Sequence, residues 1–156
     1  MCNYPTKSLS GVGIVYKFCS YIDSLLGKCY ADDYLDLVSL GLIADVMDTR
    51  DFETQFFIQE GLKNIRNPFL QEMVGKDSMH FKDGETPLMN SIAWYVAPFV
   101  NAVTRVGSIN EKYLVFESML DFKAYLQVPS TKRGCKGQEE PLVIQACRTV
   151  TNVKNH

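Results

Sequence analysis

Apolar residues recur at steps of three and four along much of the chain, the spacing that places them on one side of an α-helix. Residues 10–27 form such a stripe, which predicts a first amphipathic helix. The next stretch, residues 33–48 (DYLDLVSLGLIADVMD), leaves no wholly polar face, so this helix should be surrounded by protein. A third helix is predicted from Asp51 to about Arg66, where Asn67-Pro68 ends it. Its apolar positions are Phe52, Phe56, Ile58, Leu62 and Ile65.

The second half of the chain alternates short apolar stretches with polar ones. The pattern predicts a helical turn near residues 69–74, a loop, and renewed order from Thr86-Pro87. Residues 92–96 are β-branched and aromatic and fit a short strand or one helical turn. Three further helices are predicted: one opened by Pro98, one capped by Asn110, and one over residues 138–153 whose apolar stripe needs a partner surface. We therefore predict a mainly α chain of five or six helices with at most one short strand.

Asp45 is the acidic residue that this pattern places among apolar neighbours. Removing water from an unpaired carboxylate costs several kcal/mol, so a buried one is normally neutralised, paired with a cation or bound to a metal. Burial alone favours a structural partner over a metal, and both remain open at this point. By contrast, Asp36 is expected to face solvent in the first turn of its helix, and Asp48 to have a helix-end or turn role.

Three blocks of the sequence resemble the DHH phosphoesterases, in particular the RecJ-like single-strand exonucleases. Residues 35–48 resemble the family's fourth conserved motif, in which the position matching Asp45 is a metal ligand. Tyr4-Pro5 and residues 9–14 resemble the segment that follows the family's Asp-His-His signature. Ala97-Pro98, Asn101-Ala102 and Arg105 resemble its Ala-Pro…Asn-Ala…Arg box. The blocks follow the family's order across residues 3–125, and residues 131–154 look like phage-type members.

The resemblance implies a hydrolase that cleaves phosphodiester bonds of single-stranded DNA with Mn²⁺ or Mg²⁺, in DNA repair or recombination. In that scheme Asp45 helps to hold the metal, and Arg105 with Asn101 contacts the nucleic acid. Lys132, Arg133 and Lys136, in a basic loop, could extend the electrostatic path along the strand. For Arg105 the alternative is an ordinary salt bridge.

Two departures from the family limit the resemblance. Phe99 and Thr104 replace an Arg and a Gly that the family usually has in its third block. More importantly, no Asp-His-His triplet occurs, and the only histidines, His80 and His156, do not replace it. A two-metal phosphodiesterase needs several converging ligands, and one aspartate does not supply them. We therefore expect a helical fragment of an α/β enzyme, inactive by itself.

The expected divisions are a catalytic-domain part over residues 1–74, a loop over 75–86, the third block and its following helix over 87–128, and a basic loop with the start of the next segment over 129–156. The formal charge of −2 gives no whole-chain case for nucleic acid, although residues 130–156 carry five basic side chains against two acidic ones. Such a small imbalance is more often an ordinary solvated surface.

Five scattered cysteines without a Cys-x-x-Cys pair argue against a zinc ribbon and a secreted disulfide framework. With no leader-like start and no apolar run long enough for a bilayer, a cytoplasmic protein is expected. A different class of function also fits: a non-catalytic helical module that binds a protein partner or self-associates through exposed apolar stripes.

Overall fold

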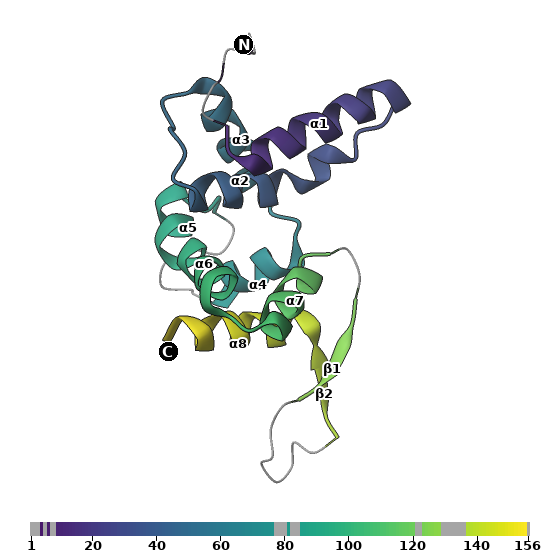
Figure 1. Cartoon of the computed structure of the whole chain (residues 1–156), viewed down its shortest axis with the longest axis vertical. Helices are drawn as coiled ribbons and strands as arrows, with labels where there is room; N and C mark the ends of the chain where they lie inside the picture. Colours follow the sequence, from purple (N-terminus) through teal and green to yellow (C-terminus); the bar gives the residue numbers. More distant parts are fainter. Residues whose placement is uncertain are drawn as a thin grey trace.

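The chain folds mainly into α-helices, as the sequence predicts. The structure, a computed structural model, describes residues 4, 6, 9–76, 81, 85–120, 123–128 and 137–155. Figure 1 shows the arrangement of these elements. In chain order they are α1 (Gly11–Leu26), a 3₁₀ turn η1 (Ala31–Tyr34), α2 (Leu35–Ala44), α3 (Phe52–Lys63), α4 (Pro68–Lys76), α5 (Met89–Tyr95), α6 (Ala97–Val106), α7 (Ile109–Ser118), β1 (Tyr125–Gln127), β2 (Glu139–Pro141) and α8 (Leu142–Asn155).

Helix α2 lies at the centre and contacts α1, α3, α5 and α6. Val38, Leu40, Leu42 and Ile43 are buried, which confirms the prediction of a helix surrounded by protein. Its neighbours approach closely because of two glycines. A side-chain carbon added to Gly61 of α3 would overlap the backbone carbonyl of Leu35, and one added to Gly41 would overlap Val12 of α1.

Helix α8 packs against α4, α6 and α7 in the lower part of Figure 1. Its buried positions Ala146, Cys147 and Val150 belong to the predicted stripe. The partner surface that this stripe requires is therefore supplied by the chain itself. The helix begins at Leu142, four residues later than predicted, because residues 139–141 pair as a strand instead.

Of the two alternatives predicted for residues 92–96, a short strand or one helical turn, the helical one is confirmed, since Met89–Tyr95 is helix α5. The strands that do form are β1 and β2, which pair antiparallel with Leu126 opposite Glu140 and flank residues 128–138. Strand pairing was not visible in the sequence because each strand has only three residues.

Two predicted helix starts are also corrected. The helix expected after Thr86-Pro87 has Leu88 as its N-cap residue. Ser108, rather than Asn110, caps α7, through a capping box in which the Ser108 hydroxyl accepts from the Glu111 N–H while the Glu111 carboxylate accepts from the Ser108 N–H. Asp51 does begin the third helix, because its carboxylate accepts a hydrogen bond from the Thr54 N–H at 3.1 Å.

Several apolar positions of the first and third helices are exposed, although the amphipathic pattern predicts that they are buried. In α3, Phe52 is 86% exposed, whereas Phe57, which was not among the predicted positions, is buried against Tyr16 with ring centroids 5.0 Å apart.

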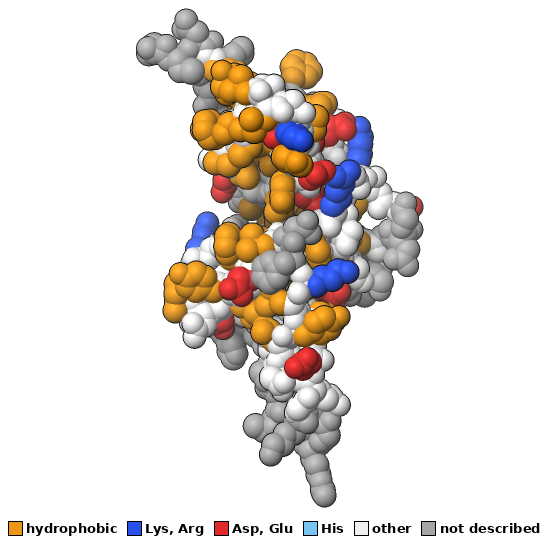
Figure 2. Space-filling model, turned by 90° about the vertical axis from the view of Figure 1, so that its right-hand side faces the viewer, with side chains coloured by type: hydrophobic (Ala, Val, Ile, Leu, Met, Phe, Trp, Pro, Cys, Tyr) orange, Lys and Arg blue, Asp and Glu red, His pale blue; other side chains and the backbone are white. Residues whose placement is uncertain are grey.

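Helix α1 ends at Gly27 as predicted, with φ of 62°. It leaves a row of apolar side chains exposed in the upper part of the molecule, where Figure 2 shows apolar surface: Ile14, Val15, Phe18, Tyr21, Ile22, Leu25 and Leu26. None of the described helices has the length and apolar character needed to span a bilayer.

Candidate nucleic-acid interface

Two of the three sequence blocks meet at one cleft, which we call the α2–α6 cleft. Its volume is about 510 Å³. One wall comes from the end of α2 and the turn after it, including Ala44, Val46 and Met47. The opposite wall comes from α5 and the start of α6, including Trp94, Pro98 and Asn101. The fold thus brings together blocks that are about 50 positions apart in the sequence.

Helix α2 ends at this cleft in a Schellman motif. The Met47 N–H donates to the Leu42 carbonyl at 3.1 Å, and the Val46 N–H donates to the Ile43 carbonyl at 3.1 Å. The motif places Val46 in the left-handed region, with φ of 54°. Glycine usually occupies this position, because a branched side chain is strained there. Because valine stands here instead of glycine, the end of the helix before Asp45 could not be predicted from the sequence.

Asp45 is exposed, which corrects the prediction that it lies inside a core. It is the C-cap residue of α2, and the turn that begins there takes its side chain off the buried face of the helix. Among the described residues its carboxylate has neither a hydrogen-bond partner nor an ion-pair partner. Neither the predicted burial nor a structural pairing with Arg is seen in this part of the chain. Asp45 instead lies beside the cleft, between the lining residues Ala44 and Val46.

Asp36 is the buried carboxylate of α2, where the sequence analysis expected an exposed one. Its side chain is buried to 2% exposure. Oδ2 accepts from the N–H groups of Arg66 at 2.8 Å and Asn67 at 2.7 Å, and Oδ1 accepts from the Leu37 N–H at 2.7 Å. These donors explain how a carboxylate is accommodated in the core. Local pattern could not reveal them, because two of the three lie about 30 positions further along the chain.

Asp48 takes the turn role that was predicted for it. Its carboxylate accepts from the backbone N–H of Arg50 at 3.0 Å and from the Arg50 guanidinium, with Nη2 at 2.7 Å. The side-chain hydrogen bonds from Arg50 lower the pKa of Asp48 from 3.8 to about 2, with the backbone hydrogen bond adding to the effect. In the structure the Asp48 carboxylate is therefore paired with Arg50.

Asn101 and Arg105 lie one turn apart on α6 and so share a face of that helix. Asn101 lines the α2–α6 cleft, and Arg105 is exposed in the last turn. Arg105 forms no ion pair with any residue that the structure describes, so the salt bridge considered from the sequence is not found there. Because the residue is exposed, its guanidinium is accessible and suits a phosphate.

The other predicted basic contacts, Lys132, Arg133 and Lys136, lie outside the described residues, as do His80 and His156. Within the described ranges, no group of three or more His, Cys, Asp or Glu side chains could hold a metal ion. These residues alone do not fit a metal centre.

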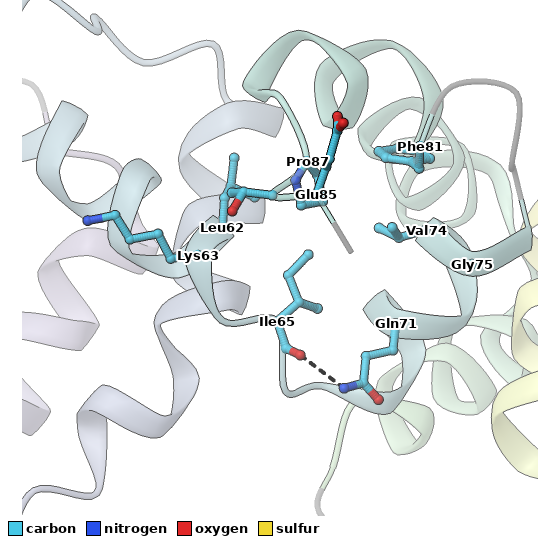
Figure 3. A pocket seen from close by; sticks show the side chains of 10 residues that line it. Leu62, Lys63, Ile65, Gln71, Val74, Gly75, Phe81, Glu85 and Pro87 are labelled. Carbon is cyan, nitrogen blue, oxygen red and sulfur yellow. Dashed lines mark hydrogen bonds between the residues drawn. The ribbon is translucent and has the colours of Figure 1, made fainter. Parts of the chain in front are cut away.

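The α2–α6 cleft continues along α3. A second cleft of about 530 Å³, the α3–α5 cleft, shares Thr49, Ile58 and Met89 with it and is also lined by Gln55 and Gln59. A third, of about 310 Å³, shares Leu62 and Lys63 with the second. Figure 3 shows that its residues come from α3, α4 and the segments between α3 and α5, with the Lys63 side chain extending away from the hollow. On its wall, Gln71 Nε2 donates to the Ile65 carbonyl at 2.9 Å. The shared residues show that the three hollows adjoin one another.

The chain is similar to a segment of proteins named as single-strand-specific exonucleases, RecJ among them, which supports the RecJ-like resemblance carried by the three sequence blocks. Bacillus subtilis has a relative named putative SPbeta prophage-derived single-strand DNA-specific exonuclease YorK, 42% identical over 132 residues, which are 85% of this chain and 22% of that protein. The B. subtilis single-stranded-DNA-specific exonuclease RecJ is 32% identical over 125 residues, 79% of this chain and 15% of that protein.

A third relative, RecJ of Dickeya dadantii, is 25% identical over 124 residues, 70% of this chain and 21% of that protein. The chain thus spans about a fifth of the length of the relatives it matches. No protein-family model and no solved structure matches it.

Proposed function

We propose that this chain is the strand-contacting part of a RecJ-like exonuclease that hydrolyses phosphodiester bonds in single-stranded DNA. The observation that carries the proposal is the α2–α6 cleft, where the end of the block containing Asp45 faces the block containing Asn101. The relatives named as single-strand-specific exonucleases support the same substrate. The setting that fits is the cytoplasm, in DNA repair or recombination, including that of a phage.

Arg105 is the phosphate contact in this proposal. Its guanidinium is exposed, has no acidic partner among the described side chains, and lies one turn beyond Asn101. Arginine matches the geometry of a phosphate with two parallel N–H donors. Binding should therefore weaken with salt, with a slope of roughly 0.7 in log affinity per log salt for each phosphate neutralised on a single strand.

Asp45 supplies one carboxylate to a Mn²⁺ or Mg²⁺ centre in the complete enzyme. The described residues do not build that centre alone, so the remaining ligands must come from outside the part of the chain that the structure describes. When bound, the metal ions of such hydrolases activate water and neutralise developing charge. The 156-residue chain by itself is expected to have no nuclease activity.

The binding test uses a fluorescent oligo-dT and the 156-residue chain, with anisotropy measured at 50 and 200 mM salt. We expect binding that weakens with salt and is reduced in Arg105→Ala. Lys123→Ala is the matched control, because it removes an exposed positive charge from the segment before β1 and should leave affinity nearly unchanged. Binding that is equally affected by both variants, or is absent at low salt, would contradict the proposal.

The activity test uses the same oligonucleotide with 5 mM Mn²⁺ and denaturing gels. We expect no cleavage by the purified chain. Cleavage that survives Asp45→Ala would refute both the metal role of Asp45 and the dependence on further ligands.

A second candidate is a non-catalytic helical module that binds a protein or a second copy of itself. The exposed apolar row on α1, with Phe18 and Leu25 each about two-thirds exposed, favours it. The corresponding argument for the last helix no longer holds, because α8 is covered. Gel filtration across a concentration series separates the candidates: dimers that are indifferent to oligonucleotide and are lost in Phe18→Glu support the module.

A further inference from the structure

We propose that the groove beside α5, formed by the α2–α6 and α3–α5 clefts, binds nucleobases and that Trp94 is the side chain on which a base stacks. The inference rests on the proposed function and adds that the groove recognises the bases of the strand. Arg105 would hold the backbone phosphate, while the groove next to it would hold the uncharged part of the same nucleotides.

The groove has the wrong chemistry for phosphate and suitable chemistry for a base. Among the residues that the structure describes, no charged side chain lines the α2–α6 cleft. In the α3–α5 cleft the charged lining residue is Lys63, which forms an ion pair with Glu60 at 2.5 Å. What remains is apolar surface with amides: Asn90 and Asn101 in the first cleft, Gln55 and Gln59 in the second. A nucleobase offers a flat apolar face and a hydrogen-bonding edge, which such a surface can satisfy.

Trp94 is unusually placed for a tryptophan. It is 71% exposed, although the large aromatic surface of tryptophan normally favours burial. It lies on the cleft wall one helical turn after Asn90, so the ring and an amide are presented from the same side of α5. An exposed aromatic ring beside hydrogen-bonding groups is the arrangement with which proteins hold single strands through their bases.

The position of Arg105 agrees with this division. Asn101 lines the cleft, and Arg105 follows it by four residues on α6, a rise of about 6 Å along the helix axis. A strand whose base enters the cleft beside Asn101 can therefore place a phosphate near the guanidinium. Because stacking on an aromatic ring tolerates any base, the subsite fits sequence-independent binding of a single strand.

The sequence provides a direct probe, because Trp94 is the single tryptophan of the chain. Tryptophan emission of the 156-residue chain is titrated with oligo-dT and, in parallel, with an abasic oligonucleotide of the same length and charge. We expect quenching by oligo-dT, saturating with the anisotropy of a labelled strand, and weak quenching by the abasic strand at equal salt.

Two variants test the ring itself. Trp94→Leu should weaken oligo-dT binding by roughly 5- to 150-fold, the range found for loss of one base stack, while Trp94→Phe should keep most of the affinity. Abasic-strand affinity should be unchanged in Trp94→Leu. Circular dichroism checks that each variant folds. Both should fold, because the Trp94 ring is mostly exposed and contributes little to the core.

The outcomes separate this inference from the proposed function. If oligo-dT binds with dependence on Arg105 but Trp94 emission does not change and Trp94→Leu binds normally, the base subsite is wrong and the phosphate contact stands. Equal quenching by abasic and oligo-dT strands also overturns the base contact. If neither strand binds at low salt, the proposed function fails, and the subsite fails with it.

Discussion

The Asp36 carboxylate accepts a hydrogen bond from the backbone N–H of Asn67 at 2.7 Å, and this contact ties the start of α2 to the start of α4. A second bond from the Arg66 N–H to the same oxygen reinforces it. Asn67 in turn caps α4 through its side-chain oxygen, which accepts from the Phe69 N–H at 3.1 Å. One carboxylate therefore positions a connection that joins the two halves of the helical core.

We predict that Asp36→Ala destabilises the chain by about 3 kcal/mol or more, since each buried donor left unsatisfied costs about 1–3 kcal/mol. Urea unfolding followed by circular dichroism measures the change. Asp33→Ala is the control, because Asp33 makes only an exposed ion pair with Arg66, which is worth about 0–1 kcal/mol. Similar losses in both variants would mean that the buried contacts of Asp36 contribute little.

Gly61 is required where α3 crosses α2. We predict that Gly61→Ala destabilises the fold by about 1–3 kcal/mol, because the added carbon meets the backbone carbonyl of Leu35 and the helices have to move apart. Gly75→Ala is the matched control in α4: it meets nothing within 4 Å and should be neutral or stabilising by up to about 1 kcal/mol. Thermal melts of the two variants test the prediction. Equal shifts in melting temperature for both variants would show that helix propensity, and not the contact with Leu35, determines the change in stability.

Much of this fold follows from local sequence pattern. The apolar stripes of α1 and α8 and the uniformly apolar α2 are visible as periodicity, and Asp51 and Gly27 mark helix ends by the capping rules. Burial is harder to predict because it depends on which neighbour covers a face. The predicted burial of Asp36 and Asp45 is therefore the reverse of what is found. The hydrogen-bond partners of Asp36 are distant in the chain, and no glycine in the sequence marks the turn that exposes Asp45.

The cleft was predictable only in part. The blocks containing Asp45 and Asn101 were recognised separately, but nothing in their spacing shows that they face each other across one hollow. The pattern around Trp94 fits a short strand or one helical turn, and neither alternative predicts a role for its side chain. Its exposure on the cleft wall depends on which elements cover that face of α5, which is a tertiary feature.

Val46 is a point of backbone strain next to Asp45. It has φ of 54° and is 87% exposed, so its side chain makes little packing contribution. We predict that Val46→Gly stabilises the chain by about 1 kcal/mol: relief of a strained left-handed conformation is worth about 1–3 kcal/mol, and glycine loses about 0.5–1 kcal/mol of that through unfolded-state entropy. Val46→Asn should act in the same direction. Thermal and urea unfolding check both. A loss of stability in both variants would show that the valine side chain supports the cleft wall.

The last prediction concerns Asp48 and Arg50, the ion pair in the turn that leads from the cleft to α3. Hydrogen bonds from the Arg50 side chain lower the pKa of Asp48 to about 2, below its usual 3.8. A lowered carboxyl pKa means that the interaction is fully present above the unfolded value and is lost as the pH falls from about 4 through 2. We expect Arg50→Ala to raise the pKa of Asp48 toward 3.8, measured by NMR titration of its carboxyl carbon. Lys63→Ala, which removes a cation from the separate pair with Glu60, should leave the titration of Asp48 unchanged. An Asp48 pKa near 3.8 in the unmodified chain would show that Arg50 does not hold this carboxylate, which would then be free to join Asp45 in binding a cation.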